Sequence, residues 1–483
     1  MATVSILQIS DLHRDPANPI RNDTLLTSLD NDRSRYTRNG DPVIGLPDIV
    51  IISGDIIQGV QPGTPDADAK LATQHGEALD FLGQLTERFV GGDRRRVVIV
   101  PGNHDVSACH FVDSLSRVDI VPDRKKQLVS QLFSQESPLR WSWSDLELFK
   151  ITDPQKYAER LAPFATFYEQ FYAGRRKYSL DPSEQFDIFD FPEFGLTIVG
   201  FSSCFNNDIF NKPGAIHPGC IAAASTRLRD RQFDGRLRLA VWHHNTEGLP
   251  MQADYMDPGI LQNLIDSGFS LGFHGHQHRP QFLDTRFRYG GDRRITVISA
   301  GTLCGSASFR FGRAYNIVEL DTEGQTGRLH LREMQNDDLR LPIWGCRSLP
   351  PGTANFLAFE YDPPPEPLTR PDRNTFALLE AQKLYEQGEY QKAAEILDDL
   401  EAKDDLARPL LLECLRKLGD TAKIIARFDP PASPNEAICL MDALWAEGGR
   451  DRLRALLAEP VVADSADLSV IEMRIKYSAR FKK

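Results

Sequence analysis

Short apolar runs rich in β-branched residues recur through the first two thirds of this 483-residue chain. Longer mixed-charge stretches of helical character separate them, such as "ATQHGEALDFLGQLTERF" (72–89). Near-continuous apolar strands that alternate with helices predict an α/β fold whose sheet is buried on both faces. The expected strands lie in "VSILQIS" (4–10), "PDIVIISGD" (47–55), "RRVVIVPGNHD" (95–105), "GLTIVGFSS" (195–203), "LRLAVWHHN" (237–245), "FSLGFHGH" (269–276), "RITVISAGT" (294–302) and "RAYNIVEL" (313–320).

Two regions depart from this alternation. Residues 107–190 are rich in aromatic and charged residues without a clean strand, and we interpret them as an inserted, mostly helical cap. Residues 363–371, "PPPEPLTRP", contain five prolines and predict an extended, semi-rigid spacer. The expected organisation is a first domain over 1–345 that includes the insert, a proline-rich linker over 346–373 and a helical domain over 374–483.

The residues after the linker predict three similar helix pairs. Each pair reads as helix, glycine-containing turn, helix, and the turns contain Gly388, Gly419 and Gly448. A near-constant period of about 30 residues favours a short stacked array. The segment "YEQGEYQKAAEIL" resembles a tetratricopeptide repeat, whereas the other two pairs match loosely. An ordinary small helical bundle is the alternative.

Composition restricts the possible partners and compartments. A net charge of −12 argues against a protein that coats nucleic acid nonspecifically, although basic clusters such as Arg175, Arg176 and Lys177 leave a smaller phosphate-binding patch open. Seven scattered cysteines without a CxxC pair favour a reducing compartment, so we expect a cytoplasmic protein. No apolar run approaches the length of a membrane span, and "MATVSILQIS" reads as a first strand rather than a leader.

Polar residues of metal-ligating type follow five of the predicted strands. Since the carboxyl ends of strands meet at one edge of an open α/β sheet, we expect these side chains to converge. Carboxylates, an amide and imidazoles without a thiolate suit Mn²⁺, Fe or Zn²⁺. The set exceeds the needs of one tetrahedral ion, and it divides into two sites if one carboxylate bridges, as in two-metal displacement at phosphorus. The residues are Asp11, His13, Asp55, Asn103, His104, Asp105, His243, His244, His276 and His278.

Several other residues have competing interpretations. In "FHGHQHRP", strand alternation would place His274, His276 and His278 on one side, with His274 either behind the ligands or in the core. His110 and His217 lie in loop-like segments that reach either the site or the surface, and Cys304 has no special context beyond a strand end. Neither a G-x-S-x-G elbow nor a G-x-x-x-x-G-K-[ST] loop occurs, so serine-hydrolase and P-loop chemistry have no support.

The ordered series D-x-H, G-D, G-N-H-D, H and G-H-x-H resembles the calcineurin-like metallophosphoesterase family over roughly residues 4–335. The resemblance implies two packed mixed β-sheets flanked by helices. It also implies that His104 assists the leaving group and that Asp55 bridges two metals. The other implied ligands are Asp11, His13 and His278 for one metal and Asn103, His243 and His276 for the second. Asp105 either orients His104 or caps its loop.

These observations predict a binuclear metal-dependent phosphoesterase, with Mn²⁺ favoured, that hydrolyses a phosphodiester or nucleotide phosphate by metal-activated water. One alternative is an Mre11/SbcD-like nuclease acting on nucleic acid in repair or defence. Another is an inert fold used as a binding scaffold, which is disfavoured because no ligand of the series is missing. We expect the C-terminal helices to bind a protein partner.

Overall fold

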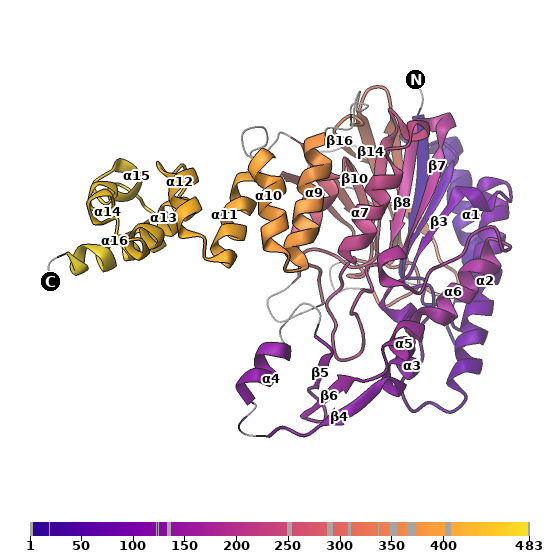
Figure 1. Ribbon diagram of the computed structural model, residues 1–483. Coiled ribbons are helices and arrows are strands. Elements are labelled where there is room, and N and C mark those ends of the chain that lie inside the picture. Colours follow the sequence, from indigo (N-terminus) through magenta and orange to yellow (C-terminus); the bar gives the residue numbers. More distant parts are fainter. Residues whose placement is uncertain are drawn as a thin grey trace. The chain divides into compact units, whose positions relative to one another are not determined.

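The computed structural model describes residues 3–481 except 19, 122, 124, 133–136, 249–253, 287–292, 308–310, 337, 348–354, 366–372 and 401–406. The chain divides into two compact units, Met1–Pro367 and Leu368–Lys483 (Figure 1). Within the described ranges, no helix combines the length and the apolar character that a membrane span requires.

A seven-stranded sheet begins with the N-terminal strand of the first unit. Its strands are β1 (Thr3–Ile9), β2 (Ile49–Ser53), β3 (Val97–Val100), β13 (Ala314–Asp321), β14 (Thr326–Met334), β15 (Trp344–Cys346) and β16 (Leu357–Glu360). The order is β15-β14-β13-β1-β2-β3, and β16 also pairs with β14. β1, β2 and β3 are parallel, so their carboxyl ends lie at the same edge of the sheet.

A six-stranded sheet forms the second layer. Its strands are β7 (Phe186–Phe191), β8 (Leu196–Phe201), β9 (Leu237–Val241), β10 (Leu271–His274), β11 (Gln281–Arg286) and β12 (Arg294–Ser299). They follow the order β11-β12-β10-β9-β8-β7. The four central strands are parallel, and the edge strands β7 and β11 are antiparallel to their neighbours. All eight strands that the apolar runs predicted are present in the two sheets.

The two sheets pack against each other through a shared apolar core. One cluster joins Ile9 and Val98 of the first sheet to Ile198 and Leu239 of the second. A Cβ atom on Gly200 would lie 2.9 Å from Val100 Cγ1, so the strands β8 and β3 approach closely there. Burying each such aliphatic side chain contributes roughly 1.5–3 kcal/mol, which explains why these strands are apolar on both faces.

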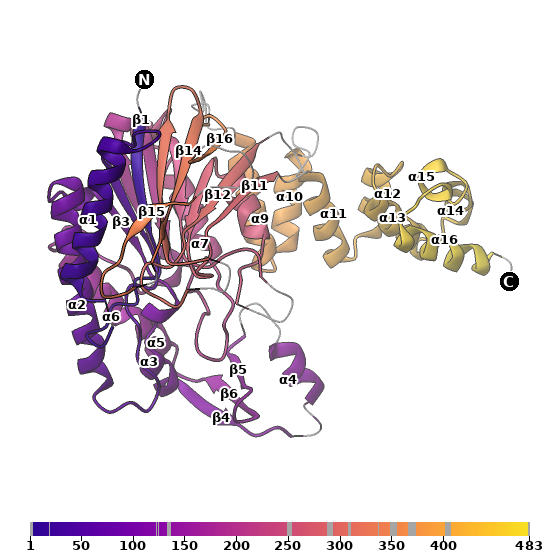
Figure 2. The same cartoon turned by 180° about the vertical axis from the view of Figure 1, so that it is seen from behind.

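Helices cover the outer faces of both sheets (Figures 1 and 2). The helices α1 (Asn22–Asn39) and α2 (Ala67–Val90) lie against the first sheet, and Leu29 and Phe81 bury their side chains in its core. The helices α7 (Pro218–Arg227) and α8 (Gly259–Asp266) lie against the second sheet through Ala224, Leu264 and their neighbours. The result is the predicted pair of mixed sheets flanked by helices.

The insert over 107–190 contains strands as well as helices, so the expectation that it has no clean strand was wrong. A three-stranded antiparallel sheet has the order β4-β6-β5, with β4 (Leu115–Val118), β5 (Leu139–Ser142) and β6 (Glu147–Ile151). These strands have only four or five residues, and most residues of β4 and β6 are at least partly exposed, so none of the three forms a long apolar run. The helices are α3 (Ala108–Asp113), α4 (Lys125–Leu132), α5 (Pro154–Ala158) and α6 (Ala162–Phe171).

The segment expected to be a linker also contains regular structure. The strand β16 lies inside the range 346–373 and pairs with β14. Phe359 of β16 and the nearby Tyr361 bury their rings in the core of the first unit. Part of the proline-rich stretch, residues 366–372, lies outside the described residues. The division at Pro367 therefore lies within the proline-rich stretch rather than at 345.

The second unit is helical throughout its described residues. Gly388, Gly419 and Gly448 each have a positive φ at the turn between two helices, a conformation that glycine adopts without steric cost. The predicted pattern of helix, glycine turn and helix is therefore present three times. The helices are α9 (Arg373–Glu386), α10 (Tyr390–Leu400), α11 (Ala407–Leu418), α12 (Thr421–Phe428), α13 (Pro434–Ala446), α14 (Arg450–Leu456), α15 (Pro460–Ala463) and α16 (Leu468–Arg480).

Candidate metal centre

Five loops at the carboxyl ends of strands bring the predicted ligands together. Asp11 and His13 follow β1, Asp55 follows β2, and Asn103 follows β3. In the second sheet, His243 follows β9, whereas His276 and His278 follow β10. Three groups of side chains each hold ligand-type atoms within 4.8 Å of one another: Asp11, His13 and His278; His13, Asp55 and His104; Asp55, His243 and His276.

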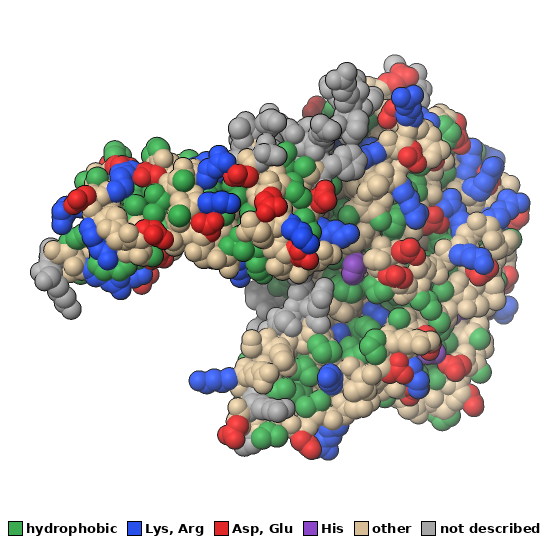
Figure 3. Space-filling view, in the orientation of Figure 1, with side chains coloured by type: hydrophobic (Ala, Val, Ile, Leu, Met, Phe, Trp, Pro, Cys, Tyr) green, Lys and Arg blue, Asp and Glu red, His purple; other side chains and the backbone are tan. Residues whose placement is uncertain are grey.

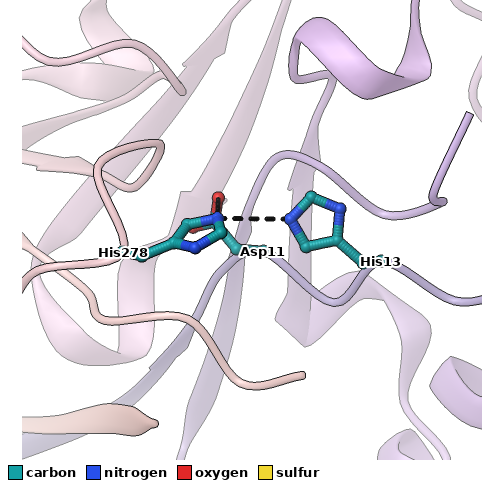
Figure 4. A group of neighbouring side chains, drawn as sticks. All are labelled: Asp11, His13 and His278. Carbon is teal, nitrogen blue, oxygen red and sulfur yellow. Dashed lines mark hydrogen bonds and ion pairs between the residues drawn. The ribbon is translucent and has the colours of Figure 1, made fainter. Parts of the chain in front are cut away.

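The first group contains one carboxylate and two imidazoles. His13 Nε2 lies 3.3 Å from His278 Nε2, and His278 Nε2 lies 3.3 Å from Asp11 Oδ1. Figure 4 shows the rings of His13 and His278 pointing toward each other from different loops, with Asp11 beside His278. Asp11 and His13 are almost fully buried, whereas His278 is partly exposed. This group can therefore hold a cation that stays open to solvent on the His278 side.

In the group of Asp55, His243 and His276, Asn103 adds an amide oxygen to one carboxylate and two imidazoles. Asn103 Oδ1 lies 3.1 Å from His243 Nε2 and 2.9 Å from His276 Nδ1. His243 Nε2 also lies 3.3 Å from Asp55 Oδ1. The predicted ligands Asn103, His243 and His276 thus surround one point beside Asp55.

Asp55 lies between the two groups and presents one oxygen to each. Its Oδ1 faces His243 and accepts a hydrogen bond from the backbone N–H of His104 at 2.9 Å. Its Oδ2 lies 3.9 Å from His13 Nε2. This is the position that a bridging carboxylate requires.

Charge at the centre favours bound cations. Burial would raise the pKa of Asp11, but the adjacent His278 lowers it to about 2. Burial would likewise lower the pKa of His243, but Asp55 raises it to about 9, and Asp11 similarly raises the pKa of His278 to about 9. Without a cation, the carboxylates therefore keep these two imidazoles protonated, and a metal would replace the protons.

Buried atoms without a hydrogen bond show that the donor set fits metal ions. Asp11 Oδ1 and His276 Nε2 make no hydrogen bond within the described residues, and their nearest charged groups, on His278 and Asp254, lie at 3.3 Å and 3.6 Å. Such groups carry a free-energy cost unless they bind a partner such as an ion. Oxygen and nitrogen donors without a thiolate suit divalent ions of the Mn²⁺, Fe or Zn²⁺ type.

Backbone hydrogen bonds fix the tautomers of three histidines. Nδ1–H donates to a carbonyl oxygen in His243 (Ser53, 2.8 Å), His278 (Ser306, 2.7 Å) and His104 (Gln58, 2.7 Å). Since one ring nitrogen is occupied, Nε2 is left as the acceptor that faces the centre. For His104, which is partly exposed, Nε2 is also the nitrogen available for proton transfer to a bound molecule.

The backbone of the centre is strained. Left-handed φ values are uncommon for residues with a Cβ atom and concentrate at functional sites. Ten described non-glycine residues have positive φ, and half of them are predicted ligands: Asp11 (55°), His13 (44°), Asp55 (51°), His276 (76°) and His278 (52°). The ligand loops therefore adopt conformations that only the surrounding packing maintains.

Two motif glycines admit the ligands by lacking a side chain. A Cβ atom on Gly102 would lie 2.2 Å from Asp55 Oδ1, and one on Gly275 would lie 2.7 Å from Asp11 Oδ2. Both distances are shorter than atoms can approach. The glycines of G-N-H-D and G-H-x-H are thus required by the carboxylates that pack against them.

Asp105 joins two loops through hydrogen bonds to backbone groups, which agrees with the loop-capping alternative for this residue. Its carboxylate is buried and accepts hydrogen bonds from the backbone N–H groups of Gly102 (2.8 Å), Ile56 (3.2 Å) and Ile57 (3.2 Å). His104 instead uses Gln58 as the partner of its Nδ1. Burial, reinforced by the charge of Asp55, raises the pKa of Asp105 to about 7. Asp105 joins the loop of Asp55 to that of Asn103.

The neighbouring histidines separate into ligand candidates and core residues. His243, not His244, faces Asp55, because the Nδ1 of His244 is 2.8 Å from Ser203 Oγ. His274 lies in the core, which is one of its two predicted positions, and it does not share a strand with His276 and His278. β10 ends at His274, which is buried and stacks on Trp242, so strand alternation does not continue past it.

The remaining candidates lie outside the three groups. His110 is 2.8 Å from Ser107 Oγ, and His217 caps the start of α7 by accepting from the N–H of Gly219. Cys304 is buried beside Arg14. Arg175, Arg176 and Lys177 line a separate cavity with Arg95 and Asp187.

Sequence patterns missed Asp254. Its Oδ2 lies 3.6 Å from His276 Nε2, whereas Asn103 lies near the other ring nitrogen, Nδ1. A carboxylate in this position orients a ligating imidazole and increases its basicity. Asp254 belongs to no motif of the series, so nothing in the sequence distinguishes it from a surface aspartate.

The chain is similar to known phosphoesterases in sequence pattern and in fold. The family model of the calcineurin-like phosphoesterases matches residues 4–280. A dimetal phosphatase from Danio rerio is 12% identical with a TM-score of 0.36, and the match covers 68% of this chain and 95% of that one. A metallophosphoesterase from Sphaerobacter thermophilus is 14% identical with a TM-score of 0.27 (69% and 90% covered). No match was found among curated proteins.

Proposed function

The chain belongs to the calcineurin-like phosphoesterase family, and we propose that it hydrolyses a phosphodiester or nucleotide phosphate bond with two divalent metal ions. The observation that carries this proposal is the position of Asp55, whose two oxygens face different groups of ligand-type side chains. One ion would be held by Asp11, His13 and His278, and the other by Asn103, His243 and His276. Asp55 would contact both.

Each part of the centre has a role in this reaction. Two divalent ions supply charge neutralisation for the phosphate oxygens and lower the pKa of water in the site. Asp105 and the glycines keep the Asp55 and Asn103 loops together. His104 holds a proton on Nδ1 through Gln58 and offers Nε2 to the departing oxygen. The chain's own residues would thus bind the metal ions, hold the ligand loops in place and protonate the departing oxygen.

The ligand chemistry supports Mn²⁺ as the working metal, because oxygen donors and imidazoles are mixed and thiolates are absent from the three groups of described residues. The complete set of ligands also supports an enzyme over an inert scaffold. All seven cysteines are free, which supports a reducing, cytoplasmic location. We further propose that the helices of the second unit bind a protein partner, as a tetratricopeptide-like array would.

A substrate panel tests the proposed reaction. Purified, Mn²⁺-loaded protein should hydrolyse at least one of an aryl phosphomonoester, an aryl phosphodiester, a cyclic nucleotide, DNA and RNA. Asp11→Ala should abolish that activity, and Asp48→Ala, which changes a carboxylate near Ser5 outside the three groups, should retain it. No turnover of any substrate by a fully metal-loaded protein would favour the scaffold.

A further inference from the structure

Two basic triplets far apart in the sequence meet at one surface cavity. Arg94–Arg96 precede β3, and Arg175–Lys177 follow α6. The Tyr172 hydroxyl donates to the Val97 carbonyl at 2.6 Å, and Arg94 donates to the carbonyl of Phe171, so α6 and β3 are joined here. The cavity has a volume of about 500 Å³, and its lining is Arg95, Arg175, Arg176, Lys177 and Asp187.

The cations of this cavity differ in how they are held. Arg176 is rigid, because its Nη1 contacts Asp187 at 2.7 Å and its guanidinium lies 3.9 Å from the Phe189 ring centroid. Arg175 is exposed and has no side-chain ion pair with a described residue. The Lys177 side chain is 78% exposed, and its ion pair with Glu169 is long, at 3.8 Å. Arg175 and Lys177 are therefore available to a ligand, and Arg176 provides a fixed anchor.

The local charge opposes that of the whole chain. Around the two triplets the ion-pair partners are Asp93, Asp187, Glu169 and Glu193, fewer carboxylates than the six cations. The complete chain carries −12. Figure 3 shows Lys and Arg side chains gathered along the edge of the first unit where β3 and β7 lie in Figure 1. An excess of cations on an acidic protein makes this edge attractive to an anion.

We propose that this cavity binds the phosphate backbone of a single-stranded nucleic acid whose scissile bond lies at the metal centre. The inference rests on the proposed function and narrows its substrate to a polymer. Exposed, separate cations suit a polyanion, because affinity then comes from the release of many counterions. A small anion would require a more enclosed site than this open cavity.

The topology sets a minimum length for such a strand. Arg95 and Asn103 lie at opposite ends of β3. The four residues of β3 alone span about 13 Å at roughly 3.3 Å per residue, and the 3-10 helix of Arg94–Arg96 and the loop to Asn103 lie beyond its two ends. A stacked strand rises about 3.4 Å per nucleotide along its axis, so a strand that reaches both sites has more than about four nucleotides. A shorter oligonucleotide contacts one site or the other.

The test measures binding separately from hydrolysis. Full-length, metal-loaded protein is titrated by fluorescence anisotropy with phosphorothioate-linked single strands of 4 and 20 nucleotides, whose integrity is checked on denaturing gels. The variant is Arg175→Ala/Lys177→Ala. The control, Lys417→Ala/Lys423→Ala, removes the same charge from exposed positions of the second unit. Turnover of an aryl diester is measured on the same preparations and reports on the metal centre alone.

For the 20-mer, the variant should bind roughly tenfold to thirtyfold more weakly than wild type in 0.1 M salt. The slope of log affinity against log salt should fall by about 1.4, since each lost single-strand phosphate contact removes about 0.7. The gain in affinity from 4 to 20 nucleotides should also shrink, and aryl-diester turnover should not change. An unchanged slope, or equal weakening in the control, overturns the proposal. Variant-sensitive binding to phosphatidylserine vesicles without oligonucleotide binding also overturns it, in favour of a membrane surface. If the metal-loaded wild-type protein did not hydrolyse the aryl diester, that result would count against the proposed metal centre and not against the cavity.

Discussion

Asp105→Ala separates a loop-capping role from a catalytic one. Asp105 accepts from the backbone N–H groups of Gly102, Ile56 and Ile57, and all three contacts are buried. Leaving a buried donor unpaired costs about 1–3 kcal/mol. Three such donors give about 3–9 kcal/mol if they relax little, and water that enters the space reduces this.

Amide hydrogen exchange measures this loss of local stability at each of the three amides. A local loss of about 3 kcal/mol corresponds to roughly 10²-fold faster exchange of those three amides. Because the loops carry Asp55 and Asn103, metal affinity should fall by about 10- to 100-fold, as for other groups that orient ligands. Asp48→Ala is the matched control, since Asp48 accepts from the Ser5 amide at 2.9 Å. It should accelerate exchange at Ser5 and leave metal affinity unchanged.

A different result would support a catalytic role for Asp105. If Asp105→Asn lowered kcat for a nucleotide while the three amides exchanged at the wild-type rate, Asp105 would act through His104. Unchanged exchange together with unchanged activity would show that the hydrogen bonds contribute little.

Three further predictions follow from the centre and the second unit. His104→Ala should keep both metals and lower kcat by about 10²–10⁴-fold for a substrate with a nucleoside leaving group. It should lower kcat little for a nitrophenolate leaving group, because a general acid matters most when the leaving group is basic. Equal losses of kcat for the two substrates in steady-state assays would contradict this role of His104. Since the pKa values of His243 and His278 are raised to about 9 without metal, these imidazoles are protonated at pH 7 and neutral at pH 10. Metal affinity should therefore rise with pH up to about 9, and calorimetry in buffers of different ionisation enthalpy should detect proton release at pH 7 but not at pH 10. Truncation after Pro367 should leave aryl-diester hydrolysis largely intact and remove partner binding in pull-down assays; a folded but inactive fragment would mean that the helices help to build the site.

The sequence was most informative where one physical constraint acts alone. Strands such as Ile49–Ser53 are buried on both faces, so their apolar runs needed no context to be identified. The ligands follow directly after such strands, and parallel pairing brings them to one edge. Spacing also distinguished the glycine turns at Gly388 and Gly419, where only the sign of φ matters.

The sequence left residues open, or missed them, where their position depends on contacts between distant segments. Asp105 is adjacent to His104 in sequence, yet its partners Ile56 and Ile57 come from another loop. Asp254 reaches His276 from a loop without a pattern of its own. The short strands of the insert, such as Leu115–Val118, are stabilised by pairing and not by their own composition. In each case the determining interaction is tertiary.

The most direct test of the shared-carboxylate centre is the metal content of wild type, Asp55→Ala and Asp11→Ala, measured by elemental analysis after purification with Mn²⁺. Because Asp55 presents Oδ1 to His243 and Oδ2 to His13, its loss should weaken both sites, whereas Asp11→Ala should weaken one. We expect about two equivalents in wild type, about one in Asp11→Ala and the least in Asp55→Ala. A single tightly bound metal that supports full wild-type activity, or an Asp55→Ala protein that retains two metals, would contradict the account.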